Sequence, residues 1–322
     1  MASMSKLMRC LCFLACIPSG GALLLKVWGL ATMAQGGALF VLCLPILLFG
    51  YFWALRHDES LARALRLGSW AGLLGTIGYD LVRVPFHVYG FRVFAPIQAY
   101  GVWLLEGDRS SGWSEAMGWL YHFSNGITFG IMYALVMGGR HWGWGVLWGL
   151  CLESIVLSSP FARIFHIQGN WPAIAIAYGA HVAYGYPLGY LVGRWEVADL
   201  QFREAANHFK LLGALLLAGF IAGPIPTERA RDQRALAGTL RVEGLTLNPS
   251  WVRLAVVGSV QFLNEGSDSV VVVQPSGKRE LVLEPNELRD WKFERPGIYQ
   301  FYLKSQKGSK SSFVIVEPVE QP

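Results

Sequence analysis

The chain has 322 residues and a formal net charge of +5 at pH 7; 53% of the residues are hydrophobic and only 15% are charged. This length allows two domains, and so apolar a composition excludes an ordinary soluble protein of this size. The modest charge, with no basic run among aromatic residues, argues against a nucleic-acid partner. The five cysteines all lie in apolar segments, so neither a disulfide framework nor a CxxC zinc site is expected.

Apolar blocks of membrane-spanning length follow one another from Leu7 to about Pro226. A helix needs roughly 20 apolar residues to cross the hydrocarbon core. The blocks predict spans near 7–25, 31–55, 67–89, 115–137, 142–160, 173–193 and 209–226. The first block is alternatively a signal segment, since Lys6 and Arg9 precede it. The sequence therefore predicts a polytopic α-helical membrane domain over residues 1–226, with six or seven spans surrounded by membrane lipid.

The basic residues of the loops predict the orientation of these spans. Lysine and arginine are concentrated in the loops near 56–66, 138–141 and 193–210. Successive loops lie on alternate sides of the membrane, which places these three on the same side. An excess of basic residues marks that side as cytoplasmic. The residues after Thr227 then lie on the periplasmic or equivalent side of the plasma (inner) membrane. Two outer loops, 90–113 and 159–172, are rich in aromatic residues, which favours helices or re-entrant pieces at the outer interface.

Four of the predicted spans carry an acid or a histidine. A charge at the centre of a span costs at least about 2.5–3.5 kcal/mol, so each needs a partner or a purpose. Counted at ~1.5 Å per residue from the outer end of its span, each of these residues lies at a similar depth in the outer half of the membrane. They are Asp80, His122, Glu153 and His181. Imidazole with carboxylate suits zinc, iron or manganese, and also suits proton transfer.

A buried polar network is the alternative to such a metal site. In it Asp80 pairs with Arg83, which is three residues along the same helix face, and the histidines bond across helices to tyrosine, asparagine or Glu153. The further members of this supporting network are His87, Asn125, Tyr178 and Tyr184. No HExxH or ExxH spacing occurs within a span, which favours the network. No catalytic residue is assigned from the sequence.

From Ala237 onward apolar and polar residues alternate with a period of two, which is typical of strands. Short segments of this kind are separated by Gly, Pro, Asn and Ser at the spacing of a sandwich. They lie near 239–249, 251–266, 269–275, 279–297, 298–306 and 311–318. The pattern predicts a linker over 227–238 and an all-β sandwich over 239–322.

The segments "GSVQFLNEGSDSVVVV", "LEPNELRDWKFERPGIYQFYL" and "SFVIV" follow one another in the order of the landmarks of a cupredoxin. The C-terminal domain therefore resembles a cupredoxin-like β-sandwich, with an immunoglobulin-like sandwich as the alternative. In that family a histidine follows the first segment, and a cysteine, a second histidine and often a methionine follow the Pro-Gly-x-Tyr strand. Here the corresponding stretches, 267–273 and 303–312, contain no Cys, His or Met. A trigonal copper site cannot form, and no copper is expected in this domain.

Three functions are compatible with this organisation. The first is a non-enzymatic accessory or scaffold subunit of a larger membrane complex, redox, photosynthetic or respiratory, that docks a membrane-protein partner through its outer sandwich. The second is a membrane metalloprotein or enzyme in which Asp80, His122, Glu153 and His181 hold a transition metal, Arg83 positions a carboxylate and the sandwich acts as a lid. The third is a proton-coupled transporter. No cofactor is assigned beyond this hypothetical metal.

Overall fold

The computed structural model describes residues 2–89, 91, 93–165, 167–193, 238–244, 246–248, 251–254, 259–295, 297–306 and 312–316. These residues form a helical region followed by a C-terminal β region in two sheets. The predicted span at 209–226, and the predicted linker up to residue 237, lie outside the described residues.

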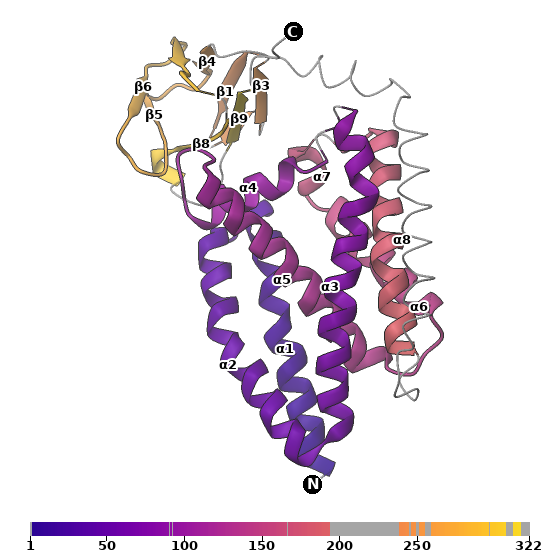
Figure 1. Ribbon diagram of the computed structural model, residues 1–322. Helices are drawn as coiled ribbons and strands as arrows, with labels where there is room; N and C mark the ends of the chain where they lie inside the picture. The colour runs from indigo at the N-terminus through magenta and orange to yellow at the C-terminus, as the bar shows by residue number, and fades with distance from the viewer. Residues whose placement is uncertain are drawn as a thin grey trace.

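The described helices run parallel or antiparallel to a common direction, with short helices at one end (Figure 1). In chain order they are α1 (Ala2–Val27), α2 (Met33–His57), α3 (Glu59–Val88), α4 (Ala95–Leu104), α5 (Gly112–Met137), α6 (Gly143–Leu157), α7 (Phe161–Ile164) and α8 (Trp171–Gly193). Local caps define several of their ends. Thr32 forms a capping box with Gln35 at the start of α2, Asp58 accepts a hydrogen bond from the Leu61 N–H at the start of α3, and Ser111 caps α5.

Helices occur at six of the seven places where the sequence predicts spans, and the seventh place lies outside the described residues. Among the described residues two of them, Ser3–Val27 and Met33–His57, are long and apolar enough to cross a membrane by length and composition. The helix in the fifth predicted span, α6, is apolar but has only 15 residues. The two aromatic loops each contain a short helix, α4 in the first and α7 in the second.

Glycines let the long helices approach to backbone contact. Each of four helices carries a pair of glycines four residues apart: Gly68 and Gly72 in α3, Gly126 and Gly130 in α5, Gly145 and Gly149 in α6, and Gly185 and Gly189 in α8. The pair in α3 faces the pair in α5, and the pair in α6 faces the pair in α8. A Cβ atom at Gly68, for example, would be 2.7 Å from the carbonyl oxygen of Gly130. These are small-xxx-small crossings of the kind that bring membrane helices close together.

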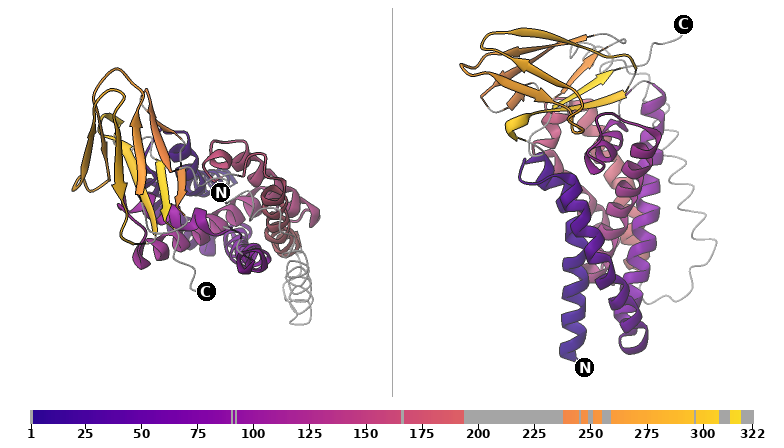
Figure 2. Two further views of the ribbon diagram at one scale, coloured as in Figure 1. Left: turned by 90° about the horizontal axis from the view of Figure 1, so that it is seen from above. Right: turned by 90° about the vertical axis from the view of Figure 1, so that its left-hand side faces the viewer.

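The β region lies beyond the end of the helices that carries α4 and α7, opposite to the N-terminal end of α1 (Figures 1 and 2). Its strands are β1 (Thr239–Glu243), β2 (Thr246–Asn248), β3 (Trp251–Leu254), β4 (Ser259–Asn264), β5 (Val270–Val273), β6 (Glu280–Leu283), β7 (Leu288–Lys292), β8 (Gly297–Leu303) and β9 (Ser312–Val316). One sheet has the order β2-β1-β4-β7 and the other the order β3-β9-β8-β5-β6. The pairs β1–β4 and β3–β9 are parallel, and the other described pairs are antiparallel.

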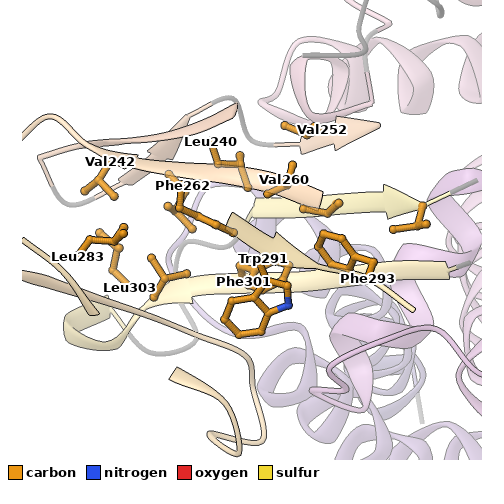
Figure 3. Close-up of a cluster of buried hydrophobic side chains, with 14 residues drawn as sticks. Leu240, Val242, Val252, Val260, Phe262, Leu283, Trp291, Phe293, Phe301 and Leu303 are labelled. Carbon is orange, nitrogen blue, oxygen red and sulfur yellow. The ribbon is translucent and has the colours of Figure 1, made fainter. Parts of the chain in front are cut away.

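The core of the β region lies between the two sheets. Figure 3 shows side chains such as Leu240, Phe262 and Phe301 pointing into the same space from different strands. The ring of Phe301 in β8 lies 5.3 Å from that of Phe262 in β4 and 5.0 Å from that of Trp291 in β7, measured between centroids. Such aromatic contacts across a buried layer hold the two sheets face to face.

A loop of the helical region joins the edge of β8. The Ser110 N–H donates a hydrogen bond to the Ile298 carbonyl oxygen at 2.8 Å, and the Gln300 N–H donates one to the Asp108 carbonyl oxygen at 3.1 Å. The Asp108 carboxylate also accepts a hydrogen bond from the Ser276 N–H at 2.7 Å. Strand β5 pairs with β8 only at Leu303 and Tyr302, so residues 108–110 occupy the part of the β8 edge that β5 leaves unpaired. This strand addition docks the β region onto the helices.

Candidate binding site in the helical domain

The glycine crossings determine where the predicted site residues lie. His122 is four residues before Gly126 in α5, and His181 is four residues before Gly185 in α8. Glu153 is four residues after Gly149 in α6, and Asp80 is eight residues after Gly72 in α3. Because residues four apart lie on the same helix face, each polar residue continues the face that makes the crossing. Each crossing therefore ends in one histidine and one carboxylate.

The first pair joins α5 to α3. The Nε2 atom of His122 is 3.1 Å from both carboxylate oxygens of Asp80. An ionised carboxylate only accepts hydrogen bonds, so Nε2–H is the donor to Asp80, and Nδ1 carries the lone pair whenever the ring is neutral. Asp80 also accepts a hydrogen bond at 3.3 Å from a terminal nitrogen of Arg83, as expected from their spacing of three residues on one helix.

The second pair joins α8 to α6. The Nδ1 atom of His181 is 3.0 Å from the carbonyl oxygen of Ala177 and 3.2 Å from Oε2 of Glu153. A carbonyl oxygen cannot donate, so Nδ1 carries the hydrogen and Nε2 carries the lone pair of the neutral ring. Glu153 is only 5% exposed, and a buried carboxylate is costly unless it is paired or hydrogen-bonded.

Tyr79 connects the two pairs. Its ring centroid lies 5.7 Å from that of His122 and 4.8 Å from that of His181. The guanidinium carbon of Arg83 lies 4.6 Å from the ring centroid of Tyr79 and 4.6 Å from that of Phe94, so this group is held between two aromatic rings. Arg83 is 6% exposed, and its position is set by these rings and by Asp80.

A cavity of about 200 Å³ brings the two pairs into one site. Its lining includes Arg83, His122, Glu153 and His181. Most of the remaining lining is apolar or aromatic and comes from α1, α3, α4, α5, α6, α7 and α8 and the loops beside α4 and α7. The cavity therefore lies toward the end of the helices that faces the β region. A concave, mostly apolar space with a few convergent polar groups is the usual form of a small-molecule site.

Three of the four predicted ligands, His122, Glu153 and His181, thus line one cavity, and the fourth, Asp80, pairs with His122. Among the residues that the structure describes, no three His, Cys, Asp or Glu side chains are grouped as they would be around a metal ion. Each histidine instead uses one ring nitrogen on a carboxylate or carbonyl oxygen and keeps the other for a further partner.

The supporting residues have different positions. Tyr184 donates a hydrogen bond to the Gly126 carbonyl oxygen at 2.8 Å and lines the cavity, as does Asn125, whose Oδ1 accepts a hydrogen bond from the Ser19 hydroxyl. His87 packs its ring on Phe94 with centroids 5.2 Å apart. Tyr178 lies within hydrogen-bond distance of Ser154, at 3.0 Å, and does not line the cavity.

Tyr79 is the residue of the site that sequence reasoning missed. The available signal was its position between Asp80 and the glycine-rich stretch "GSWAGLLGTIG", which it follows directly. Tyrosine is common where spans meet the membrane interface. The residue type alone therefore does not distinguish a tyrosine that lines a cavity from one at the interface.

In the β region, the landmark asparagine has a structural role. The Nδ2 atom of Asn264 donates hydrogen bonds to the carbonyl oxygens of Asp268 and Leu283, at 2.8 and 3.1 Å, and its Oδ1 accepts one from the Gly266 N–H. In the "PNE" turn Asn286 has a φ of 60°, a left-handed conformation that favours glycine and tolerates asparagine.

Comparisons of the chain with models of protein families, with curated proteins and with solved structures found no match.

Proposed function

We propose that the chain is an integral membrane protein whose helical domain binds a small molecule in the cavity described above and exchanges protons with it. The observation that carries this proposal is the arrangement of two histidine–carboxylate pairs, His122–Asp80 and His181–Glu153, from four helices beside one cavity. Scattered polar contacts between helices would not need to line a common space.

The proposed membrane domain has six or seven spans. The lengths of α3, α5 and α8, which are 30, 26 and 23 residues, support it, because about 20 residues suffice to cross the hydrocarbon core. The charge bias of the loops supports an extracytoplasmic β region, so that the cavity opens in the outer half of the membrane.

The two pairs supply acid–base chemistry. A neutral imidazole whose N–H is held by a carboxylate or carbonyl oxygen presents its other nitrogen as a base, and the carboxylate stabilises the ring once it has taken a proton. Nδ1 of His122 and Nε2 of His181 are the nitrogens left for this purpose. This chemistry serves an enzyme that moves protons on its substrate or a proton-coupled carrier.

The β region serves this domain as a cover in the proposal. Two observations support a permanent position of the β region over the α4 and α7 end of the helices. The β region is docked through residues 108–110, and seven helices contribute to the cavity lining. We propose a cupredoxin-like sandwich, which is supported by the two sheets and by the order of the landmark segments, kept as a frame without a copper site.

A ligand screen tests the proposed binding function. Thermal unfolding of the detergent-purified protein is followed with a panel of small anions, cations, neutral molecules and metal ions. A ligand at 100 times its Kd stabilises the protein by about 2.7 kcal/mol. The variant Ala177→Phe places a ring in the cavity lining and should abolish the stabilisation. Gly179→Phe, on the same helix but with open space around it, is the matched control and should keep it.

Absence of any stabilising compound, or equal stabilisation of Ala177→Phe and wild type, contradicts the proposal. Metal analysis of the same samples, with the His122→Ala/His181→Ala variant alongside, separates a metal ion from an organic ligand. About one equivalent of metal in the wild type, lost in the variant, would identify a transition metal as the occupant, with imidazole and carboxylate as its ligands.

A second candidate function is that of a scaffold subunit that docks a membrane-protein partner through the β region. Two exposed apolar side chains on sheet edges favour it: Val282 on β6 is 49% exposed and Leu288 on β7 is 50% exposed. A partner that pairs with these edges should co-purify with the wild type in mild detergent and should be lost from Val282→Lys/Leu288→Lys. Purification of the wild type without a stoichiometric partner contradicts this function.

A further inference from the structure

Among the described residues, two carboxylates, Asp80 and Glu153, and one permanent cation, Arg83, lie in or beside the cavity wall. Arg83 and Asp80 neutralise each other across 3.3 Å. Each ring places one nitrogen at a carboxylate or carbonyl oxygen, and it adds a positive charge only if both of its nitrogens carry a hydrogen. Glu153 then has a negative charge when it is ionised, and its described ion-pair partner, His181, is cationic only if protonated. Burial of an ionised carboxylate without a cation is strongly unfavourable.

The remaining wall of the cavity is rich in aromatic rings. Six of them come from five helices and the residue after α7: Tyr79, Tyr100, Phe129, Phe161, Phe165 and Tyr184. The faces of such rings attract cations, and a cage of several rings is a recurrent way to hold an ammonium group. Two of the six, Phe161 and Phe165, lie 4.7 Å apart between centroids at the end of the cavity formed by α7.

Arg83 does not make the cavity a site for anions. Its guanidinium group is enclosed between the rings of Tyr79 and Phe94 and already has the Asp80 carboxylate as its counter-ion. An anion in the cavity would gain little from this neutral pair and would lie near the negative charge of Glu153.

The size of the cavity limits the ligand. At about 200 Å³ it is smaller than the roughly 300–1,000 Å³ of pockets that hold drug-sized molecules. It fits a molecule of few non-hydrogen atoms, so the ligand has space for one charged group and a short apolar or hydroxylated part.

We propose that the cavity binds a small organic cation with one ammonium group, which Glu153 neutralises and the aromatic rings enclose. The cation itself favours the ionised form of Glu153. This inference rests on the proposed function and names its ligand class. It accounts for the position of Glu153, the one carboxylate among the described lining residues, next to rings from several helices.

A matched pair of probes tests this inference. Choline carries a permanent positive charge, and 3,3-dimethylbutan-1-ol is its neutral analogue of the same shape. Binding of each to the full-length protein in detergent is measured by calorimetry. We expect choline to bind at least about tenfold more tightly than the alcohol, a difference of about 1.4 kcal/mol, because the rings and the carboxylate attract its charge in a desolvated site.

Two variants identify the groups responsible. Glu153→Gln keeps the shape of the side chain and should reduce the affinity for choline to that for the alcohol. Glu115→Gln, the same change elsewhere in the helical domain, should leave both affinities unchanged. If Glu153→Gln does not fold, Phe165→Leu at the α7 end of the cavity provides the second test, and it should weaken choline selectively.

Equal affinities for choline and the alcohol in the wild type overturn the inference, as does choline binding that Glu153→Gln leaves unchanged. These outcomes are distinct from failure of the proposed function. If the ligand screen finds only an anionic or neutral compound that Ala177→Phe blocks, the cavity is a binding site and only the cation assignment is wrong. If no compound of any class stabilises the protein, both proposals fail.

Discussion

Gly149 in α6 and His181 in α8 lie in backbone contact: a Cβ atom at Gly149 would be 2.5 Å from the carbonyl oxygen of His181. The contact leaves no space for a side chain between the two helices at this level. Glu153 lies one turn further along α6, on the same face, and its Oε2 is 3.2 Å from Nδ1 of His181. The second histidine–carboxylate pair therefore depends on a glycine that has no functional group.

We expect Gly149→Leu to separate α6 from α8 and to disrupt the His181–Glu153 pair. The leucine would meet main-chain atoms, which cannot rotate away, so the loss of stability should be at least about 1–3 kcal/mol. Thermal unfolding in detergent measures it. Gly179→Leu in α8 is the control, because nothing lies within 4 Å of a Cβ atom there. Similar unfolding temperatures for the two variants would contradict the crossing of α6 and α8.

We expect Asp108→Ala to loosen the β region from the helices. The change removes the acceptor for the Ser276 N–H, and the loss of an exposed hydrogen bond such as this costs about 0.5–1.5 kcal/mol. Hydrogen exchange should become faster at the N–H groups of Ile298 and Gln300 in β8, which bond to residues 110 and 108. Asp290→Ala on β7 should leave that exchange unchanged. Unaltered protection of β8 in Asp108→Ala would show that the carboxylate does not hold the loop.

We expect Asn264→Asp to destabilise the β region more than Asn264→Ala. The amide donates to two carbonyl oxygens, and a carboxylate in its place would oppose both with a negative charge in a fully buried position. Alanine leaves the two carbonyl acceptors and the Gly266 N–H without their partner, at a cost of about 1–3 kcal/mol for each buried group, but adds no opposing charge. Hydrogen exchange of β4 and β6 in the full-length protein compares the variants. The reverse order would mean that the pocket admits water.

We expect acid to remove a stabilising contribution of Asp58, at the turn between α2 and α3. Burial raises the pKa of this carboxyl, but hydrogen bonds from the Ser5 hydroxyl and the Leu61 N–H, with the charge of Arg9, outweigh burial and hold its pKa below the usual value. A lowered pKa in the folded state gives stability that is complete above the unfolded-state pKa of about 3.9 and is lost as the pH falls through the folded value.

The variant Asp58→Asn tests this pH dependence. Asparagine remains a good N-cap for α3, so the variant should lose stability near pH 6 mainly through the missing charge. It should also show a smaller further loss between pH 6 and pH 3 than the wild type. Asp268→Asn, an exposed position in the β region, should follow the wild type. Parallel pH curves for Asp58→Asn and wild type would contradict the role of the carboxylate.

The sequence by itself determined the helical region, the C-terminal strands and the lack of copper ligands after Phe262-Leu263-Asn264. These features depend on the length and period of apolar runs and on which residue types are present, and both can be read along the chain. The rise per residue of a helix predicted a common level for Asp80, His122, Glu153 and His181; in the structure three of them line one cavity, and Asp80 pairs with His122.

Only the tertiary structure decided how these residues combine. The histidines and carboxylates form two pairs because α3 crosses α5 and α6 crosses α8 at glycines. Tyr79 lies between the pairs because α3 packs against α8 with the Tyr79 ring facing His181. The docking of residues 108–110 on β8 joins segments separated by 188 positions. Packing between distant segments sets contacts of this kind. A local pattern of apolar and polar residues does not specify which residue of one segment faces which residue of another.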